Sequence, residues 1–233
     1  MSMKIWYHPL DISSQMAVLA LFECGADFQA CSIEEAGEKE RTAFLKRWPT
    51  GQLPVLLDDN WDDQIFGSSV IAEYLHVYGG FPSELLPDDQ EEAREVRSLT
   101  RFVATGLAWP MSLIWKEQLS LPSWVEPGEL EWKLAARRRE ESLPILEARL
   151  AGRSGWLAGN TFSLADCQAA PALLCYEAAQ ELNPYPRLRE YLDRCWQRPA
   201  FQQMLRLVGE RFLRYGNFLS PSLKHRLRQA KVI

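Results

Sequence analysis

The sequence lacks three features that would direct it to a membrane, a nucleic acid or the secretory pathway. No apolar run approaches the roughly 20 residues that a membrane-spanning helix needs. The first residues have neither the basic nor the apolar region of a signal peptide. The net charge is −5, so no general attraction to nucleic acid or anionic lipid is expected. The sequence therefore predicts a cytoplasmic protein that binds neither nucleic acid nor membrane.

The chain also lacks a motif for metal binding or for thiol redox chemistry. Its five cysteines are Cys24, Cys31, Cys167, Cys175 and Cys195. No pair has C-x-x-C spacing, and no cluster of His and Cys has the spacing of a zinc site. We expect reduced thiols that pack as small apolar side chains, and no bound metal.

What the chain does have is an ordinary globular composition, with 47% hydrophobic and 24% charged residues over 233 residues. Strands and helices alternate in its first part. The patterns predict strands over residues 4–8, 28–33, 55–57 and 64–66, and helices over residues 13–24, around Phe44 and from Ser68. The first strand-helix-strand unit is parallel and the last two strands form a hairpin. This order predicts a thioredoxin-like α/β domain over residues 1–79.

A second domain is predicted beyond a linker at residues 79–83, whose Gly and Pro content marks a boundary. From residue 88 to residue 233 the pattern is helical throughout. Long helices are expected over residues 88–118, with a kink at Pro110, and over residues 128–150, interrupted by Pro144. Two more should span residues 186–198 and 199–215. The basic tail from Ser220 is expected to be a solvated end rather than a nucleic-acid or membrane arm.

Ser163 and Asp166 have the spacing of a capping box at the start of a further helix. Phe162, which precedes the cap, can pack on Cys167 as a hydrophobic staple. Asp166 is also a carboxylate beside an apolar run, so an acid-base role is the alternative. The spacing favours the capping role, and we interpret Asp166 as structural.

The run from Gly51 to Ser68 has the outline of a peptide-binding site. Pro54 precedes the predicted strand, and a cis bond between Leu53 and Pro54 would present the backbone of Leu53 to a ligand. Ser68 stands at a predicted helix start, where its hydroxyl, the free N–H groups and the helix dipole suit a carboxylate.

These residues resemble the glutathione-binding domain of cytosolic glutathione transferases. There a G-x-(L/V/I)-P strand and an (E/Q)-S helix start hold the γ-glutamyl peptide. The run from Trp156 to Asp166 resembles the family's G-x-x-(F/P)-(S/T)-x-A-D motif, which starts the central helix of the all-helical domain. The resemblance implies an α/β thioredoxin-like N-terminal domain followed by an all-α C-terminal domain, a homodimer, and glutathione as cosubstrate for a small hydrophobic electrophile, as in detoxification. The implied glutathione-binding residues are Gln52, Leu53, Pro54, Gly67 and Ser68. Gly67 departs from the family pattern, which usually has an acidic or amide residue there for the amino group of glutathione.

Glutathione is activated by stabilising its thiolate, which a hydroxyl donor at a helix N-terminus can do. Family members use a Tyr, Ser or Cys in the turn after the first strand. Ser13 is the first candidate and Ser14 the second, while Tyr7 lies on the strand and can equally be buried in the core. Asp11 is expected to cap the helix, because a carboxylate beside a thiolate raises the thiol pKa. The absence of a cysteine from this turn argues against glutathionyl-cysteine redox chemistry.

The resemblance also implies an electrophile pocket between the two domains. The candidates are Trp109, Met111 and Trp115 for an apolar wall, and Phe212, Tyr215 and Phe218 for a lid. The glycyl carboxylate of glutathione needs a cation, and the sequence does not choose among several on or near the second helix. These are Lys39, Arg41, Lys46 and Arg47.

Two other functions are compatible with the sequence. The first is an interaction module that has the transferase fold without catalysis, which Gly67 and Asp11 favour. The second keeps glutathione but changes the reaction, to that of a lyase, an isomerase or a dehalogenase. Binding of glutathione discriminates the first from the enzymes.

Overall fold

The structure is a computed structural model that describes residues 3–59, 63–77, 85–119, 127–152, 155–214 and 221–229. The predicted linker at residues 79–83 lies outside these ranges. Among the helices so described, none combines the length and the apolar character that crossing a bilayer requires.

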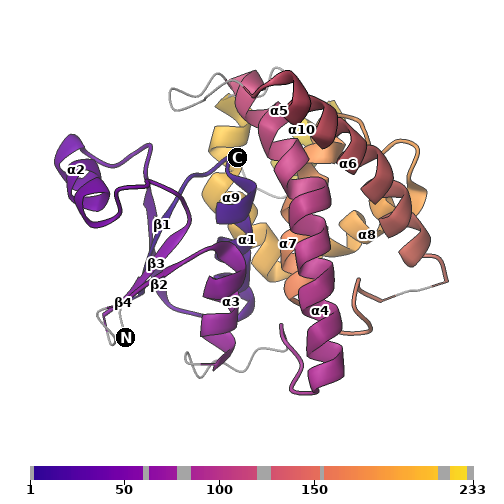
Figure 1. Cartoon of the computed structure of the whole chain (residues 1–233), viewed down its shortest axis with the longest axis horizontal. Coiled ribbons are helices and arrows are strands. Elements are labelled where there is room, and N and C mark those ends of the chain that lie inside the picture. The colour runs from indigo at the N-terminus through magenta and orange to yellow at the C-terminus, as the bar shows by residue number, and fades with distance from the viewer. Residues whose placement is uncertain are drawn as a thin grey trace.

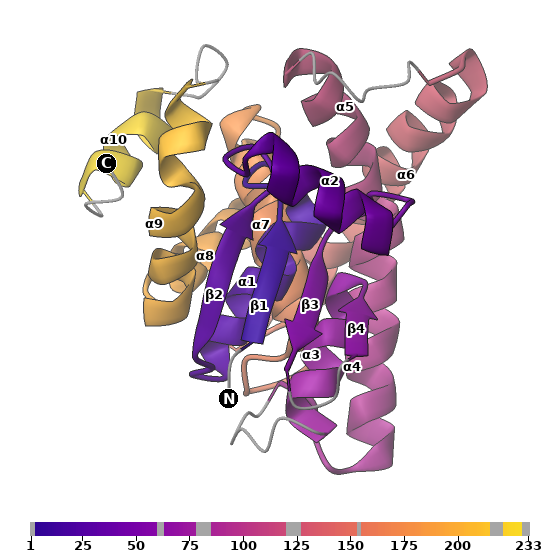
Figure 2. The same ribbon diagram turned by 90° about the vertical axis from the view of Figure 1, so that its left-hand side faces the viewer.

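The N-terminal domain has the predicted α/β arrangement. Its elements are β1 (Met3–Tyr7), α1 (Ile12–Glu23), β2 (Phe28–Ser32), α2 (Glu38–Arg47), β3 (Val55–Asp58), β4 (Asp63–Phe66) and α3 (Ser68–Val77). The strand order is β2-β1-β3-β4, with β1 and β2 parallel and the other neighbouring pairs antiparallel. Figure 2 shows α2 crossing one face of the sheet and α1 covering the other. The thioredoxin-like prediction is confirmed.

Helix α1 lies at the centre of the molecule because it is apolar on every side. The residues from Met16 to Leu21 have no solvent exposure. A helix of this kind has to be covered all round. The sheet and α3 cover one side of α1, and helices α7 and α9 of the C-terminal domain cover the other. The two domains therefore share one core, and Figure 1 shows α1 between the sheet and the helical domain.

The C-terminal domain is entirely helical in the part of the chain that is described. Its elements are α4 (Gln90–Val103), the π-helical turn η1 (Ala104–Ala108), α5 (Trp109–Leu119), α6 (Glu129–Arg149), α7 (Leu164–Ala178), α8 (Pro186–Trp196), α9 (Pro199–Arg214) and α10 (Pro221–Gln229). Every residue of α7 except Glu177 is buried, so α7 is the central helix of this domain.

The two prolines that were predicted to disturb helices have different outcomes. The predicted helix over residues 88–118 is interrupted by η1, which ends at Ala108, two residues before the predicted kink at Pro110. Pro110 has no N–H to give to the carbonyl of Gly106, so the regular ladder cannot continue there. Trp109 instead donates its N–H to Ala104, and the Leu107 carbonyl accepts the Tyr176 hydroxyl at 3.1 Å. Helix α6, by contrast, continues through Pro144, so the predicted interruption there was wrong.

The capping role of Asp166 is confirmed. The fully buried carboxylate accepts the N–H and hydroxyl of Ser163, each at 2.9 Å, the Leu157 N–H at 2.9 Å and the Tyr191 hydroxyl at 2.7 Å. Burial raises the pKa of Asp166, and these four donors oppose that rise. Each carboxylate oxygen of Asp166 accepts two hydrogen bonds from the protein, so Asp166 is structural.

The basic tail is not simply a solvated end. Helix α10 docks on the helical domain, with Leu223 and Leu227 buried. Arg226 pairs with Glu177 at 3.1 Å and with Asp193 at 2.9 Å, and its guanidinium lies over the Trp196 ring. The cysteines, by contrast, are as predicted: all are free thiols, and all but Cys31 are buried.

Gly106 generates a stability prediction, because η1 approaches α6 closely at this residue. A Cβ at Gly106 would lie 3.1 Å from the Ser142 Cβ and would overlap its Oγ. Replacing a helical glycine by alanine normally stabilises a helix by up to about 1 kcal/mol. Here we expect Gly106→Ala to destabilise the protein by about 1–3 kcal/mol through overpacking.

Denaturant unfolding of Gly106→Ala, Ser142→Gly and the double variant measures this effect. We expect Ser142→Gly to cost less in the Gly106→Ala background than in the parent protein, because it removes the overlapping side chain. A stabilised Gly106→Ala variant would show that the helices are not in close contact here.

Candidate functional site

Three segments of the N-terminal domain meet at one end of the sheet. In the antiparallel pairs, Trp6 is opposite Val55, and Val55 is opposite Phe66. The end of β1, the start of β3 and the end of β4 therefore lie side by side, at the upper end of the sheet in Figure 2. The β1–α1 turn, the segment from Gln52 to Pro54 and the start of α3 all leave the sheet there.

Leu53 presents unpaired backbone groups at this end. The peptide bond between Leu53 and Pro54 is cis. Strand β3 begins at Val55, and among the described residues neither the N–H nor the C=O of Leu53 has a hydrogen-bond partner. The neighbouring residue is held in place: the Trp48 indole N–H donates to the Gln52 carbonyl at 2.9 Å, and the Trp48 ring stacks on Phe66. Leu53 can therefore receive an extended peptide as an added strand.

The start of α3 lies beside this segment. The Gly67 N–H donates to the Pro54 carbonyl at 3.4 Å, and the Gly67 carbonyl accepts the Ile71 N–H at 2.9 Å. The helix begins at Ser68, as predicted, so the Ser68 hydroxyl and the first N–H groups of α3 lie near Leu53. Gly67 has a φ of +87°, which favours glycine, although a Cβ there would meet only Val70 at 3.9 Å. Backbone conformation rather than space therefore suits glycine at this position.

The two serines that follow the β1–α1 turn have different environments. Asp11 caps α1, as predicted, by accepting the Ser14 N–H at 2.7 Å. Ser14 is fully buried, and its Oγ accepts the His8 N–H at 3.2 Å. Ser13 is half-buried in the first turn of α1, and its hydroxyl has no hydrogen-bond partner in the part of the chain that is described. The accessible hydroxyl at the positive end of this helix is therefore that of Ser13.

Tyr7 belongs to the main core rather than to the surface of the site. Its side chain is 4% exposed and packs in the cluster that contains α1. Burial, with a smaller contribution from the negative charge of Glu35, raises the pKa of Tyr7 to about 12. Its hydroxyl therefore stays protonated at neutral pH.

A charged cluster that sequence reasoning missed lies next to this turn. His8 Nε2 lies 3.3 Å from Glu34 Oε1, and Arg211 on α9 lies 3.3 Å from Glu34 Oε2 and 2.8 Å from Glu35 Oε1. No local signal in the sequence could have found it, because Arg211 is separated from Glu35 by 176 positions.

The expected electrophile-pocket residues are only partly described. Trp109 is half-buried, with the Arg138 guanidinium 5.3 Å above its ring, whereas Met111 is fully buried in the core and exposes no surface. The other candidates lie outside the residues, or the side chains, that the structure describes; these are Trp115, Phe212, Tyr215 and Phe218.

The candidate cations Lys39, Arg41, Lys46 and Arg47 are all exposed on α2. Arg41 donates to the Ala36 carbonyl at 3.2 Å. Within the described ranges, no group of three or more His, Cys, Asp or Glu side chains could hold a metal ion.

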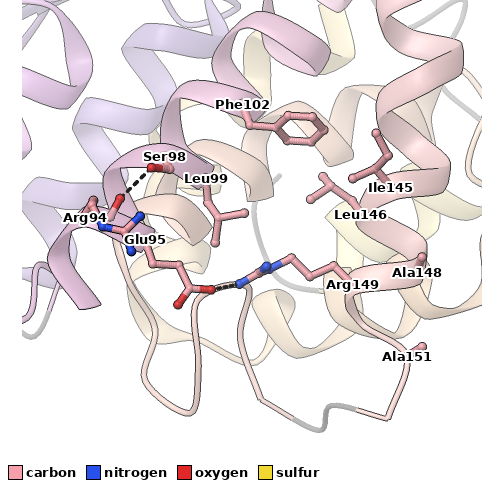
Figure 3. A pocket seen from close by; sticks show the side chains of 10 residues that line it. All are labelled: Arg94, Glu95, Ser98, Leu99, Phe102, Ile145, Leu146, Ala148, Arg149 and Ala151. Atoms are coloured by element: carbon pink, nitrogen blue, oxygen red, sulfur yellow. Dashed lines mark hydrogen bonds and ion pairs between the residues drawn. The ribbon is translucent and has the colours of Figure 1, made fainter. Parts of the chain in front are cut away.

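A separate groove of about 790 Å³ runs between α4 and α6. Figure 3 shows the apolar side chains of Leu99, Phe102, Ile145 and Leu146 along it. An ion pair between Glu95 and Arg149 lies at one end. Ile145 is 53% exposed, which is high for a large apolar side chain.

Family models match both domains. The model of the glutathione S-transferase N-terminal domain matches residues 1–76, and that of the C-terminal domain matches residues 107–199. Glutathione S-transferase F10 from Arabidopsis thaliana is 30% identical over 172 residues, which are 71% of this chain and 77% of that protein.

Solved structures have the same fold. A glutathione S-transferase from Sinorhizobium meliloti 1021 has a TM-score of 0.71 and 25% identity, covering 94% of this chain and 99% of its own. Another glutathione S-transferase, from Methylobacillus flagellatus KT with GSH bound, has a TM-score of 0.72 and 19% identity. The match covers 87% of this chain and 98% of that one. Family models match both domains, and the Arabidopsis thaliana relative is 30% identical over 71% of this chain. The chain therefore belongs to the glutathione S-transferase family.

Proposed function

We propose that this protein is a glutathione transferase that conjugates glutathione to a small hydrophobic electrophile, a detoxification reaction of the cytoplasm. The observation that carries the proposal is the backbone of Leu53, whose N–H and C=O have no partner in the described part of the chain. It lies at the end of the sheet where α1 and α3 begin. If this end of the sheet had only a structural role, the N–H and C=O of Leu53 would be expected to bond to other groups of the protein.

Glutathione binds as a short strand in this proposal. The Leu53 N–H and C=O pair with the backbone of its cysteinyl residue, and Gln52 and Pro54 flank that contact. The γ-glutamyl carboxylate accepts hydrogen bonds from the Ser68 hydroxyl and the first N–H groups of α3. Gly67 offers no side chain to the amino group, so an acceptor for that group has to come from elsewhere, such as the second subunit.

Ser13 activates the thiol. Its hydroxyl donates to the sulfur, and the positive end of α1 further favours the thiolate, so the thiol releases its proton to solvent near neutral pH. The sulfur then forms a bond to an electrophilic carbon, and the leaving group departs with its electron pair. Ser14 is the second candidate, although its Oγ is buried and already accepts the His8 N–H. For the electrophile we propose a pocket to which Trp109, Met111, Trp115 and Tyr215 contribute.

Binding to immobilised glutathione tests the proposal. We expect the protein to be retained and then eluted by free glutathione. Ser68→Ala removes a hydrogen bond to a charged group, worth about 1.5–3 kcal/mol, so the Kd should rise by about one to two orders of magnitude. Ser69→Ala, in the same helical turn, is the matched control and should bind normally.

If the parent protein shows no binding at millimolar glutathione, the proposed enzyme is wrong. The absence of a side chain at Gly67 would then favour an interaction module without catalysis. Normal binding without conjugation would instead point to a glutathione-dependent lyase, isomerase or dehalogenase.

The assignment of Ser13 has its own test. In Ser13→Ala the pKa of bound glutathione should return toward the usual thiol value of about 8.5. The thiolate fraction at neutral pH should then fall, by about tenfold for each unit by which the pKa exceeds the pH. Ultraviolet absorbance of the thiolate, titrated against pH, measures this change, and kcat should fall with little change in KM. In Ser14→Ala we expect lower stability and a smaller change in thiol pKa. An unchanged pKa in both variants would remove both serines from the mechanism.

We also propose that two copies associate over the groove between α4 and α6. Exposed apolar side chains lie in that groove, at Ile145, and on the N-terminal domain, at Phe66 and Val70. Apolar surface of this kind is typical of an interface.

Ile145→Glu should convert the dimer into a monomer, because association would bury an unpaired charge. Leu130→Glu is the control: Leu130 is 78% exposed on the same helix and does not line the groove. Sedimentation equilibrium distinguishes the variants. A monomeric parent protein, or a dimer that tolerates Ile145→Glu, would contradict the proposed interface.

A further inference from the structure

We propose that Glu34 and Arg211 are positioning residues that hold the β1–α1 turn, and with it Ser13, through the side chain of His8. This inference rests on the proposed function for its chemical consequence. The link itself is a property of the protein without ligand, so it can be tested separately.

His8 has both ring nitrogens engaged. Its Nδ1 accepts the Leu10 N–H at 3.2 Å, so the proton of the neutral ring is on Nε2, which lies 3.3 Å from Glu34. A histidine held in this way has no nitrogen free to take a proton from a thiol. His8 therefore acts as a bridge between Glu34 and the turn rather than as a general base.

Glu34 contacts both domains, through His8 of the N-terminal domain and Arg211 of α9. One carboxylate oxygen faces His8, and the other lies 3.3 Å from Arg211 Nε, an ion pair without hydrogen-bond geometry. The Glu34 and Arg211 side chains are only 19% and 14% exposed. Arg211 also reaches Glu35 at 2.8 Å, so the guanidinium is held between two neighbouring carboxylates. The pair between Glu34 and Arg211 is shielded from solvent, so it is screened less than an exposed surface pair and holds its geometry better.

The turn transmits the position of His8 to the first turn of α1. The His8 N–H donates to Ser14 Oγ at 3.2 Å, and the His8 carbonyl accepts the Asp11 N–H at 3.1 Å. Asp11 in turn caps the helix through the Ser14 N–H. Ser13 lies between these two fixed residues, so a displaced His8 would shift the hydroxyl that is proposed to hold the thiolate. Positioning errors of this kind weaken catalysis without any loss of the reacting group.

The other end of α1 offers an internal control. Arg198, which directly precedes α9, makes two bonds of 2.6 Å to Glu23 at the C-terminal end of α1. The α9 side of the helical domain is thus ion-paired to the N-terminal domain near both ends of α1. Both arginines link the two domains, but only the Arg211 cluster is next to Ser13.

Electrostatics alone and positioning predict opposite results for Glu34→Gln. Removing a negative charge near the thiolate would by itself lower the thiol pKa. Loss of positioning raises the thiol pKa instead, because the neutral amide no longer attracts Arg211 and has only one oxygen, which can face His8 or Arg211 but not both. Glu35→Gln removes the same charge one residue away and leaves the contact between Glu34 and His8 in place. Its amide oxygen can still accept from Arg211, so this variant reports mainly the electrostatic effect.

The first measurement is the thiolate absorbance of bound glutathione against pH. We expect Glu34→Gln to reduce the thiolate fraction at neutral pH about threefold or more, with KM for glutathione little changed, whereas Glu35→Gln leaves it unchanged or raises it. A thiolate fraction that rises or stays the same in Glu34→Gln would overturn the positioning role.

The second measurement needs no ligand. Amide hydrogen exchange at His8 and Leu10, whose N–H groups are bonded within the turn, should become about tenfold faster in Glu34→Gln and in Arg211→Gln. Arg198→Gln should leave these two amides unchanged. Unchanged exchange in Glu34→Gln and Arg211→Gln overturns the proposed link, whatever glutathione does. If the parent protein binds no glutathione, the proposed function fails, and the exchange result alone decides whether the link exists.

Discussion

The structure depends on the burial of one helix whose surface is apolar all round. Helix α1 cannot be satisfied by the sheet alone, since its second side would remain in water. Helices α7 and α9 cover that side, which places the C-terminal domain against the N-terminal one. The two domains are therefore parts of a single hydrophobic core, although the sheet and the helices are built separately along the chain.

The same burial confines the chemistry to the ends of the elements. The body of α1 has no exposed polar group, so this helix can offer ligand-binding groups only at its ends. Of the polar side chains at the start of α1, Asp11 and Ser14 are used to close the turn. The Ser13 hydroxyl has no hydrogen-bond partner among the described residues, because Asp11 and Ser14 make the bonds that close the turn.

Local patterns were sufficient to predict most of the fold. The strands, the Asp11 and Asp166 caps and the start of α3 at Ser68 depend on residues within a few positions of one another. Features that need distant partners could not be predicted. These features include the close approach of η1 to Ser142 and Tyr176, the burial of Met111 in the core, and the ion pairs of Arg226 that hold α10 on α7 and α8. Likewise, Glu34 and Arg211 come together only once α9 has packed on α1.

Gly67 has a consequence for ligand selectivity. In the proposed function, Ser68 binds the carboxylate of the γ-glutamyl group and Leu53 binds the cysteinyl backbone, while Gly67 has the positive φ that favours glycine. Gly67 itself offers no carboxylate or amide to bind the amino group. Under the proposed function, such a site binds the γ-glutamyl carboxylate and the peptide backbone but not the amino group. It would therefore discriminate weakly against tripeptides whose amino terminus is acylated.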